Sequence, residues 1–192
     1  MLFWGVLAFA LFFLGDYNDW KLRRAPLRAC FPAGFALLSA AVAVQAIRGR
    51  SVFSPGVRVV FFILAAGFLL LELWSLFGAL PPAEAYGKTG ESRPVRAAGM
   101  YALCRHPGVL WFLPLTVCLW GAAGLPLLSA AVYSGLDLLL IWFEDVAVFP
   151  ARLAGYGEYR RTTPFLIPSR ASVRAFRKCK GKGGDSCASM KN

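Results

Sequence analysis

Five apolar segments separated by short polar connections constrain the fold of this chain more than any other feature. They cover roughly residues 1–15, 29–47, 59–80, 109–123 and 125–143. The second and third are long enough to cross the hydrocarbon core of a bilayer, about 30 Å, as helices. The last two are separated only by residues 121–126, whose glycines and proline predict a helical hairpin with a tight turn. The sequence therefore predicts an all-α integral membrane protein with about five transmembrane helices.

The distribution of charge favours a membrane location over nucleic-acid binding. Hydrophobic residues make up 58% of the chain and charged residues 16%, and the mean hydropathy is +0.57, outside the range of ordinary soluble domains. All 21 Lys and Arg residues lie in the connections and the tail, as in membrane proteins whose basic residues flank the spans. We expect the lipid bilayer as the partner, no nucleic acid and no obligate protein partner.

The basic residues also predict the orientation of the chain. The connections 16–28 and 81–108 carry four each, the segment after residue 143 carries ten, and only Arg48, Arg50 and Arg58 lie between the second and third apolar segments. With the N-terminus outside, 18 of the 21 basic residues lie in the cytoplasm. We therefore expect an N-terminus outside the membrane and a cytoplasmic C-terminus.

These patterns divide the chain into three regions. Residues 1–80 hold the N-terminal transmembrane helices. Residues 81–168 hold a long cytoplasmic loop, the helical hairpin and a C-terminal cap. Residues 169–192 are basic and contain three glycines, which predicts a disordered tail that is attracted to anionic lipid. The five cysteines have no spacing that suggests a metal site, and Cys30 and Cys118, in apolar segments, are expected to be buried.

Three short polar groups stand beside the last two apolar segments. Arg105-His106-Pro107 precedes the fourth segment, and Glu144-Asp145 follows the fifth. The third group, Tyr156-x-x-Tyr159 with Pro164 to Pro168, comes next along the chain. His106 is the only histidine and Glu144-Asp145 the only adjacent acidic pair. Because a hairpin returns to the face on which it starts, we expect the first two groups to meet on the cytoplasmic side.

The start of the fourth segment has the chemistry of an anion site. Pro107 suits the first turn of a helix, where its missing N–H costs nothing, and His106 is a natural cap before it. The free N–H groups and the positive end of that helix attract an anion such as a carboxylate. Glu144, across the hairpin, could accept the ammonium of the same ligand. The pattern therefore predicts a site for an amino-acid-bearing cofactor.

Residues 86–168 resemble the superfamily of isoprenylcysteine carboxyl methyltransferases and phospholipid methyltransferases, which are integral membrane enzymes. Gly99-x-Tyr101-x-x-x-Arg105-His106-Pro107 is similar to one family segment, and Glu144-Asp145 followed by Tyr156-x-x-Tyr159 is similar to another. The resemblance implies an enzyme that transfers a methyl group from S-adenosyl-L-methionine to a lipophilic acceptor. Such a transfer needs alignment more than proton chemistry, so no residue is assigned a catalytic role.

The resemblance also implies the positions of the site residues. Cofactor contacts are expected at Arg93, Pro94, Val95, Arg96, Tyr101, Arg105, His106, Pro107, Gly108, Val109 and Glu144. Contacts with the acceptor are expected at Asp137, Asp145, Tyr156 and Tyr159. No metal is expected.

The chain departs from the family at a few positions, and these leave the acceptor open. Val109 replaces a tyrosine, Arg152-Leu153 replaces Phe-Gly, and Leu140 stands where the prenylcysteine branch has an arginine. A carboxyl group, an amine and a phospholipid headgroup are therefore all considered as acceptors. Two other classes stay open: an NADPH-dependent membrane oxidoreductase similar to steroid reductases, and a membrane protein without enzymatic activity.

Two carboxylates lie within the apolar segments. A charge at that depth is costly and is a candidate for function. Asp137 lies seven residues before Glu144, about 10 Å along one helix face, and Glu72 lies deep in the third segment. Either these residues line a channel for the acceptor and attract an amine, or they pair with neighbouring helices.

Overall fold

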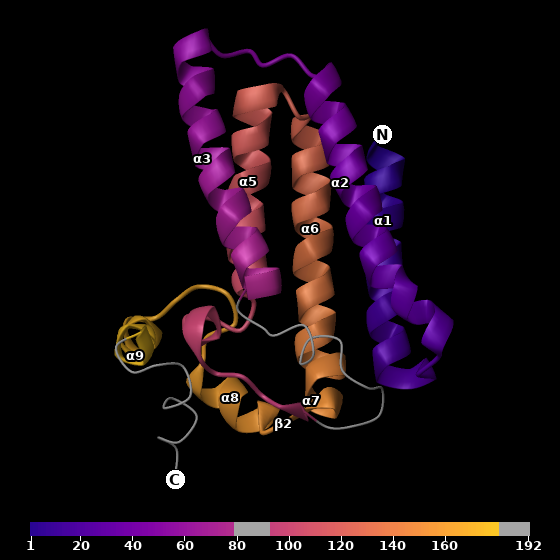
Figure 1. Cartoon of the computed structure of the whole chain (residues 1–192), viewed down its shortest axis with the longest axis vertical. Coiled ribbons are helices and arrows are strands. Elements are labelled where there is room, and N and C mark those ends of the chain that lie inside the picture. The colour runs from indigo at the N-terminus through magenta and orange to yellow at the C-terminus, as the bar shows by residue number, and fades with distance from the viewer. Residues whose placement is uncertain (79–92, 181–192) are drawn as a thin grey trace.

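The computed structural model describes residues 1–78 and 93–180, and in this part of the chain nearly every element is a helix. Long helices lie side by side along the molecule (Figure 1) and build its bundle. Their bounds are α1 (Leu2–Tyr17), α2 (Cys30–Arg48), α3 (Pro55–Leu73), α5 (Pro107–Ala123) and α6 (Leu127–Phe143). The N-terminus lies toward one end of this bundle, and the cap formed by residues 144–162 lies at the other.

Among the described residues, three helical segments are long and apolar enough to cross a membrane. They are Ala25–Arg48, Pro55–Gly78 and Leu127–Arg152. They extend α2, α3 and α6 by turns of 3₁₀ or π-helix at one end. Helices α1 and α5 are apolar but have only 16 and 17 residues. The predicted all-α fold is therefore confirmed, and three of its helices have the length and composition of membrane spans.

The turn between α5 and α6 is the tight hairpin that the sequence predicts. Helix α5 ends at Gly124, which has a left-handed φ of 75°. The loop after α2 covers this end: the Ser51 hydroxyl donates to the carbonyl of Gly121, and Arg58 Nε donates to that of Ala122 over 3.1 Å. Two carbonyls left free at the end of α5 thereby gain partners.

Small residues and a buried polar network hold α1 and α2 against α6. A Cβ on Gly5 would lie 2.2 Å from the ring of Tyr133, so only glycine allows this approach. The Tyr133 hydroxyl accepts a hydrogen bond from Gln45 Nε2 over 2.8 Å, and the Ser129 hydroxyl donates to Gln45 Oε1. Small residues and interhelical hydrogen bonds of this kind are what drive helix association in a bilayer, where apolar contact alone gives no preference.

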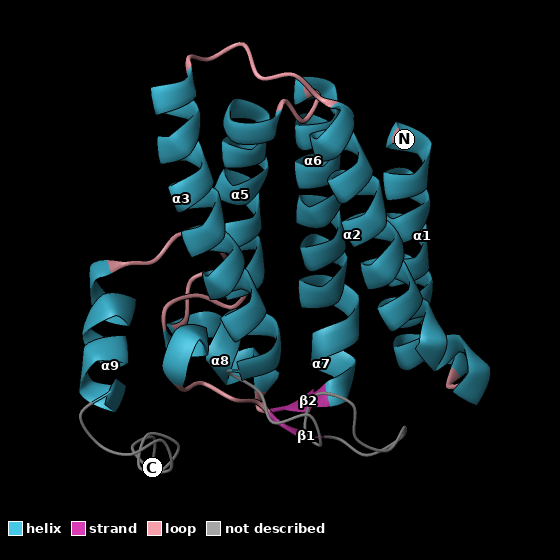
Figure 2. Cartoon of the chain, turned by 45° about the horizontal axis from the view of Figure 1, so that its top comes forward, coloured by secondary structure: helices cyan, strands magenta, loops and turns pink. Residues whose placement is uncertain are grey.

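The C-terminal cap is tied to the segment before α5 by backbone contacts. The two-residue strands β1 (Arg93–Pro94) and β2 (Leu153–Ala154) pair in parallel, as Figure 2 shows. Helix α7 (Phe149–Arg152) precedes β2, and α8 (Tyr156–Thr162) follows it. The amide of Arg105 donates to the carbonyl of Pro164 over 2.9 Å. Residues about 60 positions apart therefore enclose the start of α5.

The prediction of a disordered tail from residue 169 is wrong for its first part, because Arg170–Lys180 form helix α9. The Ser169 hydroxyl accepts from the amide of Ser172, and the Ser172 hydroxyl accepts from the amide of Ser169. This reciprocal pair is a capping box, which supplies partners to the free donors at the helix start. Residues 181–192, and 79–92 of the predicted cytoplasmic loop, lie outside the described part of the chain.

Candidate functional site

The hairpin brings the Arg-His-Pro and Glu-Asp groups together, as the sequence predicts. His106 Nδ1 lies 3.5 Å from Glu144 Oε2, and His106 Nε2 lies 3.6 Å from Asp145 Oδ1. Helix α5 begins with Pro107 in its first turn, and the side chain of its cap residue, His106, makes no capping hydrogen bond. The N–H groups at the start of α5 are therefore available to a ligand.

The two adjacent acids have different surroundings. Asp145 is buried and binds two guanidinium groups: Arg105 Nε lies 2.9 Å from Oδ1, and Arg160 Nε lies 3.3 Å from Oδ2. The Tyr156 hydroxyl donates a short hydrogen bond to Oδ1. The side chain of Glu144 is 18% exposed, and its Oε2 lies 3.5 Å from His106 Nδ1. Asp145 is therefore fully engaged within the protein, whereas Glu144 faces the space beside it.

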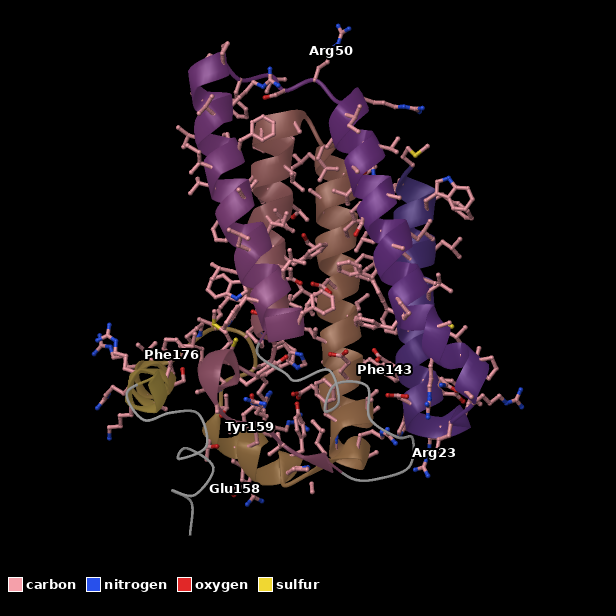
Figure 3. The ribbon with its side chains drawn as sticks, in the orientation of Figure 1. Arg23, Arg50, Phe143, Glu158, Tyr159 and Phe176 are labelled. Carbon is pink, nitrogen blue, oxygen red and sulfur yellow. The ribbon has the colours of Figure 1, made fainter. Side chains whose placement is uncertain are left out.

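Tyr156 and Tyr159 support this arrangement from inside the cap. Both are buried, and Tyr159 lies between the cap and the bundle in Figure 3. The Tyr159 hydroxyl donates to the carbonyl of Tyr101 over 2.7 Å. Burial raises the pKa of both phenols above its usual value, and for Tyr156 the hydrogen bond to Asp145 adds to the effect. Both tyrosines thus remain protonated donors.

A cavity of about 690 Å³ lies among the long helices and reaches this cluster. This volume is within the usual range of small-molecule sites. Most of its wall is apolar, from residues of α1, α2, α3, α5 and α6, and its polar groups come mainly from the helix ends next to the cap. The expected cofactor residues that line it are Tyr101, Arg105, His106, Pro107, Gly108, Val109 and Glu144.

The other expected residues divide into two groups. Asp137, an expected acceptor contact, lines the cavity. Asp145, Tyr156 and Tyr159 are not among the described wall residues, and their polar atoms make contacts within the protein. Pro94, Val95 and Arg96 are not among the residues of the described wall, and the backbone of Arg93 to Val95 pairs with β2.

The available groups fit an amino-acid-bearing cofactor, with one change from the expectation. Arg105 reaches the cavity, but its guanidinium is already bound to Asp145 and to the carbonyl of Arg160. Arg105 therefore has a structural role in the cavity wall, and its guanidinium N–H groups are engaged within the protein. The open start of α5 can receive a carboxylate, and Glu144 can receive an ammonium.

The His106 ring contacts two aromatic rings and two carboxylates. Its ring stacks on Phe149 at 5.6 Å and meets the edge of Phe165 at 5.1 Å. Burial acts to lower the pKa of His106, but the nearby carboxylates of Asp145 and Glu144 outweigh it and raise the pKa above 6.5. The imidazole is therefore biased toward the charged form, which balances the acidic pair.

Two further carboxylates lie near the site. Asp16, near the end of α1, is close enough to Glu144 for their charges to interact. The Glu72 carboxylate lies against Gly108, where an added Cβ would be 3.4 Å from Oε1. Asp16 was missed because it reads as the polar boundary of the first apolar segment. Only the packing of α1 against α6 reveals it.

The cysteine predictions hold where the structure describes them. Cys30 and Cys118 are buried, and so is Cys104. Burial raises the pKa of the Cys104 thiol to about 11. Within residues 1–78 and 93–180, no group of His, Cys, Asp and Glu is placed to hold a metal ion.

Comparison of the chain with protein-family models, with curated proteins and with solved structures gives no match. The assignment of a function therefore depends on the residues of the site and their geometry.

Proposed function

We propose that this chain is a membrane methyltransferase that uses S-adenosyl-L-methionine to methylate a lipophilic acceptor at the cytoplasmic face. The observation that carries the proposal is one cavity with apolar walls and a charged end, where the start of α5 meets Glu144. An apolar chain and a zwitterionic cofactor can occupy such a cavity together. The alignment of two bound reactants can supply several kcal/mol of the barrier.

The chain's own residues supply binding and orientation. The N–H groups at the start of α5 bind the amino-acid carboxylate of the cofactor, and Glu144 binds its ammonium. His106 orients Glu144 from the other side. Asp145 fixes Arg105, and the aromatic contacts of Phe149 and Phe165 fix the imidazole. The cofactor, when bound, supplies an electrophilic methyl group on a positively charged sulfur.

The membrane arrangement is part of the same proposal. Helices α1 and α5 cross the bilayer together with α2, α3 and α6, which makes five spans. The N-terminus is outside and the cap is cytoplasmic. The positions of the basic residues support this orientation, and so does the placement of the N-terminus and the cap at opposite ends of the bundle.

The charge of the cavity wall favours this cofactor over a nicotinamide dinucleotide. Glu72, Asp137 and Glu144 line the wall, whereas its basic groups, Arg105 and His106, already face carboxylates. A dinucleotide carries several phosphate charges and needs free cations at its site. A sulfonium-bearing cofactor carries a positive charge that the acidic wall attracts.

The test is a titration of the full chain in uncharged detergent with S-adenosylhomocysteine and, separately, with NADPH. We expect saturable binding of S-adenosylhomocysteine only. His106→Ala and Glu144→Ala should each weaken it tenfold or more, which corresponds to about 1.4 kcal/mol. Glu158→Ala, at an exposed position on α8, is the matched control and should bind as the wild type does. Binding of NADPH alone, or wild-type affinity in both site variants, would overturn the proposal.

A further inference from the structure

Two carboxylates that the cofactor does not use face the same cavity from different helices. Glu72 belongs to α3 and Asp137 to α6, and both line the wall. The charge of Asp137 acts on Glu72. Glu72 lies near the start of α5, where a Cβ added to Gly108 would be 3.4 Å from its Oε1.

Neither carboxylate has a partner among the described residues. Glu72 Oε2 is fully buried and has no hydrogen-bond partner within residues 1–78 and 93–180. Asp137 has no hydrogen bond or ion pair with any residue in the described ranges 1–78 and 93–180. A buried carboxylate without a partner is costly. The packing of α3 and α6 places both groups at the cavity, where a ligand can supply the partner.

The charge and shape of the surrounding wall specify that ligand. The basic groups of the wall, Arg105 and His106, are held by Asp145 and Glu144. The wall farther from the cap is apolar and includes Phe9, Phe62 and Phe112. A cation with a hydrocarbon chain fits both parts, whereas an anion would meet Glu72 and Asp137 without a neutralising group.

We propose that Glu72 and Asp137 bind the ammonium group of the methyl acceptor, so that the acceptor is a lipophilic amine. This inference rests on the proposed function for its methyl-transfer role, although binding of the amine does not depend on the cofactor. Leu140, a turn from Asp137 on α6, is buried at the same wall and offers no donor to an acceptor carboxylate.

The pair also accounts for a proton that the reaction must remove. An ammonium has no lone pair and cannot act as a nucleophile. One N–H bond breaks, its electron pair stays on nitrogen, and the proton forms an O–H bond with one carboxylate. The second carboxylate, at the wall of the same cavity, stabilises the cation before this transfer.

The test compares three ligands of equal chain length on the full chain in uncharged detergent: dodecylamine, dodecanol and dodecanoate. Equilibrium dialysis gives each affinity for the wild type, Glu72→Gln, Asp137→Asn and the double variant, with Glu158→Gln as the exposed control. Binding of S-adenosylhomocysteine is measured in parallel. We expect the wild type and the control to bind dodecylamine at least tenfold more tightly than dodecanol, and dodecanoate most weakly. The double variant should bind dodecylamine and dodecanol equally.

The outcomes separate this inference from the proposed function. If the wild type binds dodecylamine and dodecanol with equal affinity, the amine site is overturned. This result depends on the wild type alone and not on the binding of S-adenosylhomocysteine. If the wild type prefers dodecylamine but does not bind S-adenosylhomocysteine, the amine site is supported and the methyltransferase function is rejected. Retained selectivity in a double variant that still binds dodecanol assigns the amine to other residues and overturns the role of the pair.

Discussion

At the scale of single residues, Glu144 and Asp145 show why adjacent acids need not share a role. Successive residues on a helix point about 100° apart, so that Glu144 faces the cavity while Asp145 faces the cap. The sequence predicts that the pair meets His106, because the hairpin brings their helix ends together. It does not predict which acid is engaged, because this depends on Arg160 and Tyr156, which approach from a separate segment.

The titration of His106 is the first prediction at this scale. Because its folded pKa is raised, the imidazole should titrate above 6.5, and Glu144→Gln should bring its pKa down. The stability that the charged imidazole contributes is fully present below about pH 6.5 and is lost as the pH rises through the folded pKa. NMR with labelled histidine gives one ring signal, since His106 is the only histidine. A midpoint at or below 6.5 would contradict this.

The second prediction concerns Asp145. Its ion pair with Arg105 is buried on both sides, at 4% and 8% exposure. Removing one partner of a buried pair costs about 3–5 kcal/mol. Asp145→Asn should therefore lower the midpoint of thermal unfolding strongly. The half-exposed Arg160 adds little to this.

Glu158→Gln on the exposed face of α8 is the control and should change stability by no more than about 0.5 kcal/mol. If Asp145→Asn also changes stability by no more than about 0.5 kcal/mol, the ion pair of Asp145 does not contribute substantially to stability.

At the scale of elements, the hydrophobic pattern predicts what is local. The long helices, the start of α5 at Pro107 and the turn at Gly124 follow from apolar length, proline and glycine. The β1–β2 pair has only two residues in each strand and forms because the cap folds back on a distant segment, which no local pattern encodes. Helix α9 was missed because its basic composition favours disorder, whereas its capping serines and its contact with the 3₁₀ turn Gly99–Ala102 favour a helix.

Helix α9 carries the third prediction. It lies across the direction of the bundle, since Figure 1 shows it end-on while the long helices run vertically. Arg170, Arg174, Arg177 and Lys178 are exposed on it. In the proposed topology this helix lies at the cytoplasmic surface, where each basic residue gains about 1 kcal/mol near anionic lipid.

Amide hydrogen exchange of residues 170–180 should therefore be slower in nanodiscs that contain phosphatidylserine than in nanodiscs of phosphatidylcholine alone. Replacing Arg174 and Arg177 by Gln should remove most of this difference. Equal exchange of the wild-type helix in both lipids would show that α9 does not meet the headgroups.

At the scale of the whole molecule, the two ends of the bundle should lie on opposite sides of the membrane. Figure 3 shows Arg50 at one end and Glu158 with Tyr159 at the other. An impermeant maleimide added to intact cells should label Arg50→Cys. It should label the native tail cysteines, Cys179 and Cys187, only after permeabilisation. Cys30, Cys104 and Cys118 are buried and should stay unlabelled. Labelling of the tail on intact cells would reverse the orientation.

The distribution of the cavity wall along the chain has a consequence for any attempt to shorten this protein. Every polar motif of the site follows residue 100, which suggested a separate methyltransferase core at 81–168. The wall, however, includes Phe9, Phe12 and Glu72 from the first three long helices. A fragment that begins at residue 81 would keep all of these polar motifs but would lack the part of the cavity wall that the first three long helices provide. The motifs therefore mark one side of the site, whereas the cavity wall is built by residues between 9 and 76 together with residues between 101 and 149.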